Sequence, residues 1–186
     1  GENKIFYLQE RIGKNKKKFK IIKFVTMLEN SPNTLSGTIT VKNDPRILPL
    51  GRFLRKTKIN ELPQILNIFC GDMSFVGPRP LTSKTFDYYD ELTKNIISSV
   101  RPGLSGVGSI FFRNEEEILD KKGKIEIDLL YQNYISKYKG QLETWYVKNN
   151  SIKLYFLVLI LTLIVVLFPK TNLTNFFFKG LPEIPK

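Results

Sequence analysis

Two short segments near the start of the chain have a pattern of apolar residues that is alternating or aromatic-rich. They are IFYLQERIG (Ile5–Gly13) and FKIIKFVTM (Phe19–Met27). Alternation of this kind, with many aromatic and β-branched residues, predicts two strands. The basic run KNKKK between them predicts the turn of a hairpin. This turn is either a solvated hairpin tip or a contact for anionic lipid headgroups, and both interpretations stay open at this point.

The next part of the chain predicts short helices joined by loops. Leu28–Gly37 is rich in Ser, Pro and Asn and predicts a loop, and Asp44–Ile59 predicts a loop followed by a short helix. NELPQILNIFCG then predicts a helix in which Asn60 is the N-cap and Gly71 ends the last turn. Its apolar side chains share one face of that helix: Leu62, Ile65, Leu66 and Phe69.

Two more helices are predicted farther along the chain. Phe86–Val100 is one, closed by the RPG of Arg101–Gly103, and Asn114–Tyr138 is mostly helical with a break at Gly123. We therefore expect an α+β fold, a helix-rich membrane-associated domain with a small N-terminal β-hairpin.

An apolar run near the C-terminus bears on membrane association. Leu154–Phe168 is 15 residues without a charge. As a helix it would reach roughly 22 Å, which is short of the roughly 30 Å of hydrocarbon in a bilayer. It is apolar all round, so a buried or half-embedded helix and a true span are the alternatives. Phe176–Phe178, beside Lys179, suit an interfacial anchor or a cap on the core.

Charge and missing residue types narrow the chemistry. The 186 residues carry 29 Lys and Arg against 17 Asp and Glu, a net charge of +12, which implies a polyanionic partner. No recognition pattern for nucleic acid accompanies that charge, so we expect no nucleic-acid partner. The chain has no histidine, which excludes His-based triads and metal sites. Its one cysteine, Cys70, excludes an internal disulfide and fits a reducing compartment.

One stretch concentrates the candidate chemistry. Asn60 and Glu61 begin a predicted helix, where backbone N–H groups favour anions. Arg79 lies between two prolines, so it loses little entropy when it binds a phosphate. Acids that bind Mg²⁺ and arginines that bind phosphate suit phosphoryl transfer. The structural alternatives are a helix cap at Asn60, a turn at Asp72 and a carboxylate partner for Arg79.

The same residues resemble a known family. The run DPRILPLGRFLRKTKINELPQILNIFCGDMSFVGPRP (44–80) resembles the bacterial sugar transferases, the monotopic phosphoglycosyl transferases. Residues 6–27, VRPGLSGVGSIFFRNEEE (100–117) and DLLYQNYISKY (128–138) are similar to further segments of that family. The resemblance extends over residues 5–165.

The resemblance implies a reaction and a location. Family members transfer a phospho-sugar from a UDP-sugar to polyprenol phosphate (undecaprenyl phosphate), release UMP and so initiate bacterial glycan assembly. They need Mg²⁺ and act at the cytoplasmic face of the bacterial inner membrane, in contact with its lipids. We expect residues 1–150 to form the catalytic core. The family's N-terminal re-entrant membrane helix would lie before Gly1. Residues 151–186 would be an apolar helix and tail that associate with the membrane or join two protomers in a homodimer.

The resemblance also assigns residues, with one departure. The family's catalytic pair is an Asp-Glu in D-E-L-P-Q, in which the Asp attacks phosphate and the Glu helps bind Mg²⁺. The Glu corresponds to Glu61, and the Asp position is occupied by Asn60. Arg55, Arg79 and Arg101 correspond to substrate-binding positions, and Asp72 to a structural acid.

Asn60 leaves three interpretations open, because a neutral amide is a poor nucleophile. It is an engineered change, or it belongs to a natural subgroup in which Glu61, or another acid such as Glu115 or Glu116, takes over. Otherwise the chain is a catalytically silent homologue or partner subunit that still binds a nucleotide sugar.

Overall fold

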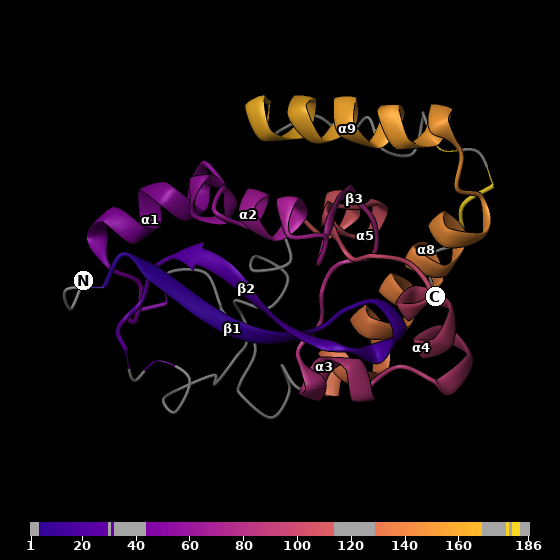
Figure 1. Cartoon of the computed structure of the whole chain (residues 1–186), viewed down its shortest axis with the longest axis horizontal. Coiled ribbons are helices and arrows are strands. Elements are labelled where there is room, and N and C mark those ends of the chain that lie inside the picture. The colour runs from indigo at the N-terminus through magenta and orange to yellow at the C-terminus, as the bar shows by residue number, and fades with distance from the viewer. Residues whose placement is uncertain are drawn as a thin grey trace.

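The computed structural model describes residues 4–29, 31, 44–113, 129–168, 178 and 180–182. The elements in chain order (Figure 1) are β1 (Phe6–Ile12), η1 (Lys14–Lys16), β2 (Lys18–Phe24), α1 (Pro49–Lys56), η3 (Ile59–Glu61), α2 (Gln64–Phe69), β3 (Ser74–Val76), α3 (Ser83–Asp87), α4 (Glu91–Ser98), β4 (Gly103–Ser105), α5 (Val107–Phe111), η4 (Tyr131–Ile135), α8 (Ser136–Lys148) and α9 (Ile152–Leu167). Four predictions lie outside the described residues: the loop at 32–37, the helix at 114–128, the acids Glu115 and Glu116, and the aromatic pair at 176–177.

The predicted N-terminal hairpin is confirmed. β1 and β2 pair antiparallel, with Gln9 opposite Ile21 and Tyr7 opposite Lys23. The basic turn η1 rests on α4, where Lys16 forms a 3.4 Å ion pair with Glu91. Together with the helices this gives mixed helix and strand, as the predicted α+β class requires.

The predicted helices after the hairpin are present, but Asn60 does not cap one. Gly71 ends the α2 segment at φ +82, which favours glycine. Asn60 lies inside the 3-10 turn η3, whose N-cap is Lys58 with φ 61. α2 begins only at Gln64, and its N-cap residue, Pro63, makes no side-chain cap bond. The N-cap prediction for Asn60 was wrong because a separate turn forms ahead of the helix.

The single helix predicted for Phe86–Val100 is two helices. α3 ends at Asp87, and α4 starts after Asp90, whose carboxylate accepts the backbone N–H of Thr93 at 2.8 Å. An aspartate N-cap of this kind begins a helix of its own.

A two-stranded parallel sheet that the sequence did not predict joins two glycine-bearing motifs. β3 pairs with β4 so that Ser74 lies opposite Gly103 and Val76 opposite Ser105. The strands have only three residues each, so they carry little periodic signal. Close backbone contact explains the glycines, since a Cβ on Gly103 would lie 2.1 Å from the Gly77 backbone nitrogen.

Gly103→Ala should destabilise the protein by about 3 kcal/mol or more, because the backbone atoms it would overlap have no room to move. That corresponds to a Tm lower by about 6–12 °C in a chain of this size. Thermal unfolding followed by circular dichroism measures it, with Asn95→Ala on the exposed side of α4 as the control. An unchanged Tm for Gly103→Ala would contradict this close packing.

The main core lies between α5, α8 and α9. Buried side chains from all three helices form it, among them Val107, Ile110, Leu142, Tyr146, Val158 and Leu161. The hydroxyls of Ser105 and Thr162 are 2.5 Å apart, so β4 and α9 are also joined by a hydrogen bond.

The apolar helix α9 is half-buried. Val158, Leu161 and Val165 face the core, whereas Phe156 and Leu163 are exposed. At 16 residues α9 is about 24 Å long. No helix among the described residues is long and apolar enough to cross a membrane.

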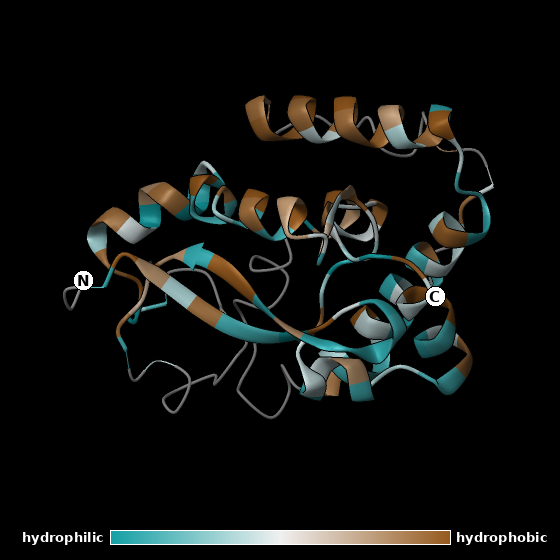
Figure 2. Ribbon diagram, in the orientation of Figure 1, coloured by the Kyte–Doolittle hydropathy of each residue, from teal (hydrophilic) through white to brown (hydrophobic). Residues whose placement is uncertain are grey.

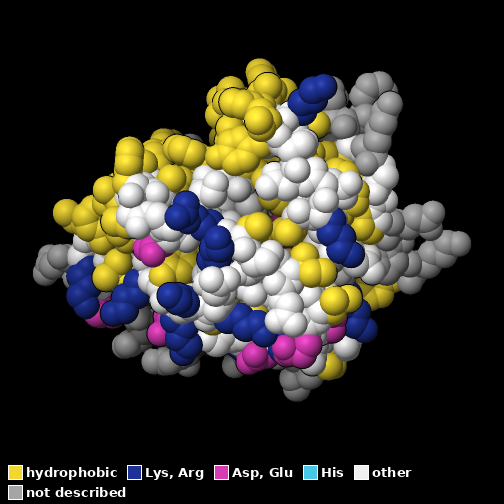
Figure 3. All heavy atoms as spheres, turned by 45° about the vertical axis from the view of Figure 1, so that its right-hand side comes forward, with side chains coloured by type: hydrophobic (Ala, Val, Ile, Leu, Met, Phe, Trp, Pro, Cys, Tyr) yellow, Lys and Arg dark blue, Asp and Glu magenta, His cyan; other side chains and the backbone are white. Residues whose placement is uncertain are grey.

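A second exposed apolar surface runs along α1, α2 and β3. We call it the apolar edge, and it consists of Leu50, Phe53, Leu62, Leu66, Phe69 and Phe75. Figure 2 shows α9 as a mostly hydrophobic ribbon and hydrophobic segments along α1 and α2 on the same side, and Figure 3 shows hydrophobic side chains gathered there. The face predicted for Leu62, Leu66 and Phe69 therefore points outward.

Candidate active site

Glu61 lies in a small pocket lined by three cationic side chains. Its Oε1 is 3.3 Å from a guanidinium nitrogen of Arg79 and 3.5 Å from Nζ of Lys23. Arg11 lines the same pocket, as do Ile21, Gln64, Pro80, Gly103 and Leu104. Glu61 is the only carboxylate among these residues, so the pocket is strongly positive.

The hairpin delivers two of the cations because of its register. Side chains two apart on a strand share a face, so Lys23 points the same way as buried Ile21. Asn67 of α2 fastens this strand to the Glu61 segment. Its Oδ1 accepts the Ile22 N–H at 3.0 Å, and its Nδ2 donates to the Lys20 carbonyl at 2.9 Å.

The charges around Glu61 decide its ionisation. Burial by itself raises the pKa of Glu61, but the cations Lys23, Arg79 and Lys58 together outweigh burial and hold the pKa well below its usual value. Glu61 is therefore ionised at neutral pH.

Two of the neighbouring cations, Lys23 and Arg11, have pKa values that are lower than usual and so closer to neutral pH. Burial, with help from Arg79 and Arg11, lowers the pKa of Lys23 to about 8 despite the charge of Glu61. Burial and Arg79 likewise lower the pKa of Arg11 to about 10. Crowded cations favour the arrival of an anion, because it relieves their mutual repulsion.

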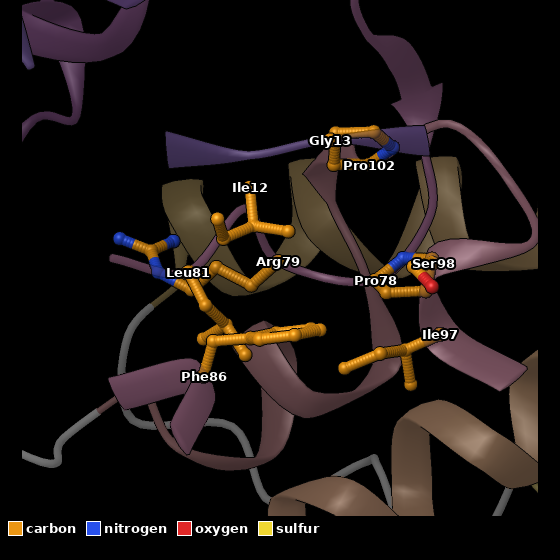
Figure 4. A pocket seen from close by; sticks show the side chains of 9 residues that line it. All are labelled: Ile12, Gly13, Pro78, Arg79, Leu81, Phe86, Ile97, Ser98 and Pro102. Carbon is orange, nitrogen blue, oxygen red and sulfur yellow. The ribbon is translucent and has the colours of Figure 1, made fainter. Parts of the chain in front are cut away.

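Arg79 is held by backbone contacts on both sides. The Pro78 carbonyl accepts the Gly103 N–H at 2.8 Å, and the Pro80 carbonyl accepts a guanidinium N–H of Arg11 at 3.1 Å. A second hollow surrounds the stem of Arg79 (Figure 4), with Leu81 and Phe86 in its wall and the guanidinium pointing outward. The rigid presentation predicted for this arginine agrees with this geometry.

Asn60 is buried beside this pocket. Its side chain is 7% exposed, and its Oδ1 has no hydrogen-bond partner among the described residues. Asn60 does not line the pocket, whereas Glu61 does.

The other predicted residues lie farther out. Arg55 is close enough to lower the pKa of Lys23, and one guanidinium nitrogen is 3.9 Å from Sδ of Met27. Arg101 is exposed, with its guanidinium beside Gly71, and does not line the Glu61 pocket. Asp72 is an exposed turn residue whose N–H donates to the Asn67 carbonyl.

Comparison of the whole chain with known protein families shows which family it belongs to. The bacterial sugar transferase family matches residues 1–169, most of the chain. The chain belongs to the bacterial sugar transferase family. The resemblance predicted from the motifs is thereby confirmed.

Similar proteins in this family carry informative names. The chain is 33% identical over 158 residues to the undecaprenyl-phosphate galactose phosphotransferase of Salmonella typhimurium, covering 77% of the chain and 29% of that protein. It is 38% identical over 133 residues to the UDP-glucose:undecaprenyl-phosphate glucose-1-phosphate transferase of Klebsiella pneumoniae (68% and 28%). It is 40% identical over 125 residues to the exopolysaccharide production protein ExoY of Sinorhizobium fredii (60% and 55%). The matches thus span about half of ExoY and under a third of the other two.

Sequence reasoning missed two cations of this sugar transferase's pocket. Arg11 and Lys23 contributed only to the charge count, although both follow a signal that can be read. Each lies two residues along the strand from a residue on the inward face of the hairpin. That residue is Gln9 for Arg11 and Ile21 for Lys23. A lysine in register with a buried isoleucine is a candidate inward charge.

The pocket suits Mg²⁺ only together with an anionic ligand. One carboxylate, Glu61, lies among three cations, and no group of three acids is present in the described part of the chain. Mg²⁺ is commonly bound by one or two carboxylates plus substrate phosphates. Glu61 supplies a carboxylate oxygen donor of the right kind, and a bound diphosphate would supply the others.

Proposed function

We propose that this sugar transferase moves a phospho-sugar from a UDP-sugar to polyprenol phosphate and releases UMP. The observation that carries this proposal is the ionised Glu61 in a pocket of three cations. The names of its relatives support the same class of reaction, since they pair undecaprenyl phosphate with galactose or glucose phosphate.

The cations have distinct roles in this proposal. Arg79, presented between prolines, binds a phosphate bidentately, and Lys23 and Arg11 stabilise the second phosphate of the diphosphate. Mg²⁺ bound through Glu61 would offset negative charge on that diphosphate. Lys23 adds a pH limit, because substrate binding weakens as it loses its proton above about pH 8.

Glu61 carries the carboxylate chemistry in this proposal, since Asn60 is a neutral amide. Whether Glu61 attacks phosphorus itself or orients the diphosphate, it must be ionised, and its surroundings keep it so. A silent nucleotide-sugar-binding homologue is the second candidate, favoured by Asn60 alone.

The apolar edge supports a membrane-bound acceptor. Phe69 is 83% exposed and Phe53 is 57% exposed, on helices that flank the Glu61 segment. A lipid surface would cover these side chains. We propose that the edge and α9 dock on the cytoplasmic face of the bacterial inner membrane, where the polyprenol phosphate lies.

Phe69→Gln should weaken binding to lipid vesicles by about 10-fold or more, because a buried Phe side chain contributes about 1.5–3 kcal/mol. Co-sedimentation with vesicles containing phosphatidylglycerol measures this. Leu92→Gln is the matched control, since Leu92 is 69% exposed on α4, away from the apolar edge. Equal losses of vesicle binding in both variants would contradict the proposal that the apolar edge faces the membrane.

Release of UMP from a panel of UDP-sugars, with undecaprenyl phosphate and Mg²⁺, tests the reaction itself. We expect UMP release that depends on both the lipid phosphate and Mg²⁺. Binding of UDP-sugar without release of UMP would instead support the silent homologue.

A further inference from the structure

A buried carboxylate outside the Glu61 pocket contacts the backbone of Arg79. Glu143 of α8 is 5% exposed, and its Oε1 accepts the backbone N–H of Arg79 at 3.3 Å. Its Oε2 has no hydrogen-bond partner among the described residues. Burying a carboxylate destabilises a protein when one of its oxygens lacks a hydrogen-bond donor. The position of Glu143 therefore needs an explanation.

The fold is shaped to admit this carboxylate. A Cβ on Gly108 would lie 2.6 Å from Oε1 of Glu143, and a Cβ on Gly106 would lie 3.5 Å from Oε2. The start of α5 therefore leaves room for the Glu143 side chain that larger residues at Gly108 would fill. Helix α5 itself carries no charged residue.

Glu143 accepts a backbone N–H from a segment, residues 78–80, that has few donors to offer. Pro78 and Pro80 have no backbone N–H, so the Arg79 amide is the one backbone donor of the three residues. Arg79 thus has a carboxylate at each end, Glu143 at its amide and Glu61 at its guanidinium.

We propose that Glu143 is a positioning residue that fixes the Arg79 backbone, and through it directs the guanidinium to Glu61 and the substrate diphosphate. This role in turnover rests on the proposed function, whereas the contact with the Arg79 amide does not. Nothing in the motif around Glu61 points to this residue, which is 82 positions later in the chain.

The carboxyl group of Glu143 has a pKa close to neutral pH. Burial raises the pKa of Glu143 to about 7, although the Arg79 amide and the charges of Lys139 and Arg79 lower it. Tyr146 on the same helix is a further titratable group, and its pKa is raised by burial, by Tyr155 and by the charge of Glu143. Among elements packed on α8, α4 carries Glu91 and Lys94, which pair with each other at 3.0 Å. Glu143 therefore ionises as pH rises through about 7, and its hold on the amide strengthens.

The contact itself is tested without any activity. In protein labelled with ¹⁵N-arginine, in detergent micelles, the Arg79 amide resonance is assigned by its loss in Arg79→Lys. We expect this resonance to titrate with a midpoint near pH 7 and to stop titrating in Glu143→Gln. An Arg79 amide that does not titrate near pH 7 in the wild type, or that titrates identically in Glu143→Gln, overturns the proposal.

Kinetics then test the role. Glu143→Gln keeps shape and an acceptor oxygen but removes the charge, so kcat/KM at pH 8 should fall about 10-fold through loosened placement of Arg79. The decline of wild-type kcat/KM below pH 7 should flatten in this variant. Its Tm at pH 8 should be unchanged or higher, because a buried charge has been removed.

Arg79→Ala separates positioning from a general structural effect. If Glu143 acts through Arg79, Glu143→Gln should cause no further loss of kcat/KM in the Arg79→Ala background. Full additivity of the two changes overturns the role. If the wild type releases no UMP, the proposed function fails, and the amide titration still decides the contact.

Discussion

Replacing Glu61 with glutamine should reduce UMP release by at least about 10³-fold, which is the scale for removing a group that acts directly on the reacting charge. Among the described residues, Glu61 is the one carboxylate that lines the pocket, and its amide replacement can neither be ionised nor bind Mg²⁺ strongly. Single-turnover release of UMP at saturating UDP-sugar measures the loss without interference from weaker binding.

The same variant should also lose stability. Glutamine leaves Lys23 and Arg79 facing each other without a counter-charge, which should cost about 2 kcal/mol, less than for a fully buried pair because Arg79 is partly exposed. The pKa of Glu61 is depressed in the folded state, so its stabilisation is present above about pH 4.5 and is lost at lower pH.

Urea unfolding from pH 3 to pH 8 checks this linkage. The wild type should lose stability below about pH 4.5 more steeply than Glu61→Gln does. The control is Glu91→Gln, which removes an exposed acid from α4. Turnover in Glu61→Gln close to that of the wild type would remove Glu61 from the reaction and with it the proposed site.

Asn60→Asp should raise UMP release by about 10²-fold or more, a gain of about 2.7 kcal/mol in transition-state stabilisation. The change restores the acid that the family motif has at this position, and carboxylates are far better nucleophiles than amides. The cations around Glu61 favour a second negative charge nearby.

The Asn60→Asp comparison also separates the three interpretations of Asn60. A large gain that is abolished by Glu61→Gln in the same background identifies a disabled but otherwise ordinary transferase. Substantial turnover by the unmodified chain, with little change in Asn60→Asp, would contradict the prediction and identify a pathway that uses Glu61 alone. UDP-sugar binding without turnover in either form would favour the silent homologue.

Local patterns were sufficient wherever one segment determined its own structure. The hairpin followed from its alternating and aromatic-rich segments, and the end of α2 followed from Gly71. They were insufficient where short elements carried competing signals. Asp90 could be a helix residue or a cap, and only the completed hydrogen bond to Thr93 decided that it starts a new helix.

The motif chemistry can be read from the residues alone: an acid at Glu61, a rigid arginine at Arg79, an amide in place of an acid at Asn60, and an excess of cations. Which cations reach Glu61, in contrast, depends on how the hairpin and the helices pack together. Lys23 and Arg11 come from the hairpin, and Glu143 reaches Arg79 from a distant helix. Charges far apart in the chain interact only at short range in space, so their pairing depends on how the elements pack.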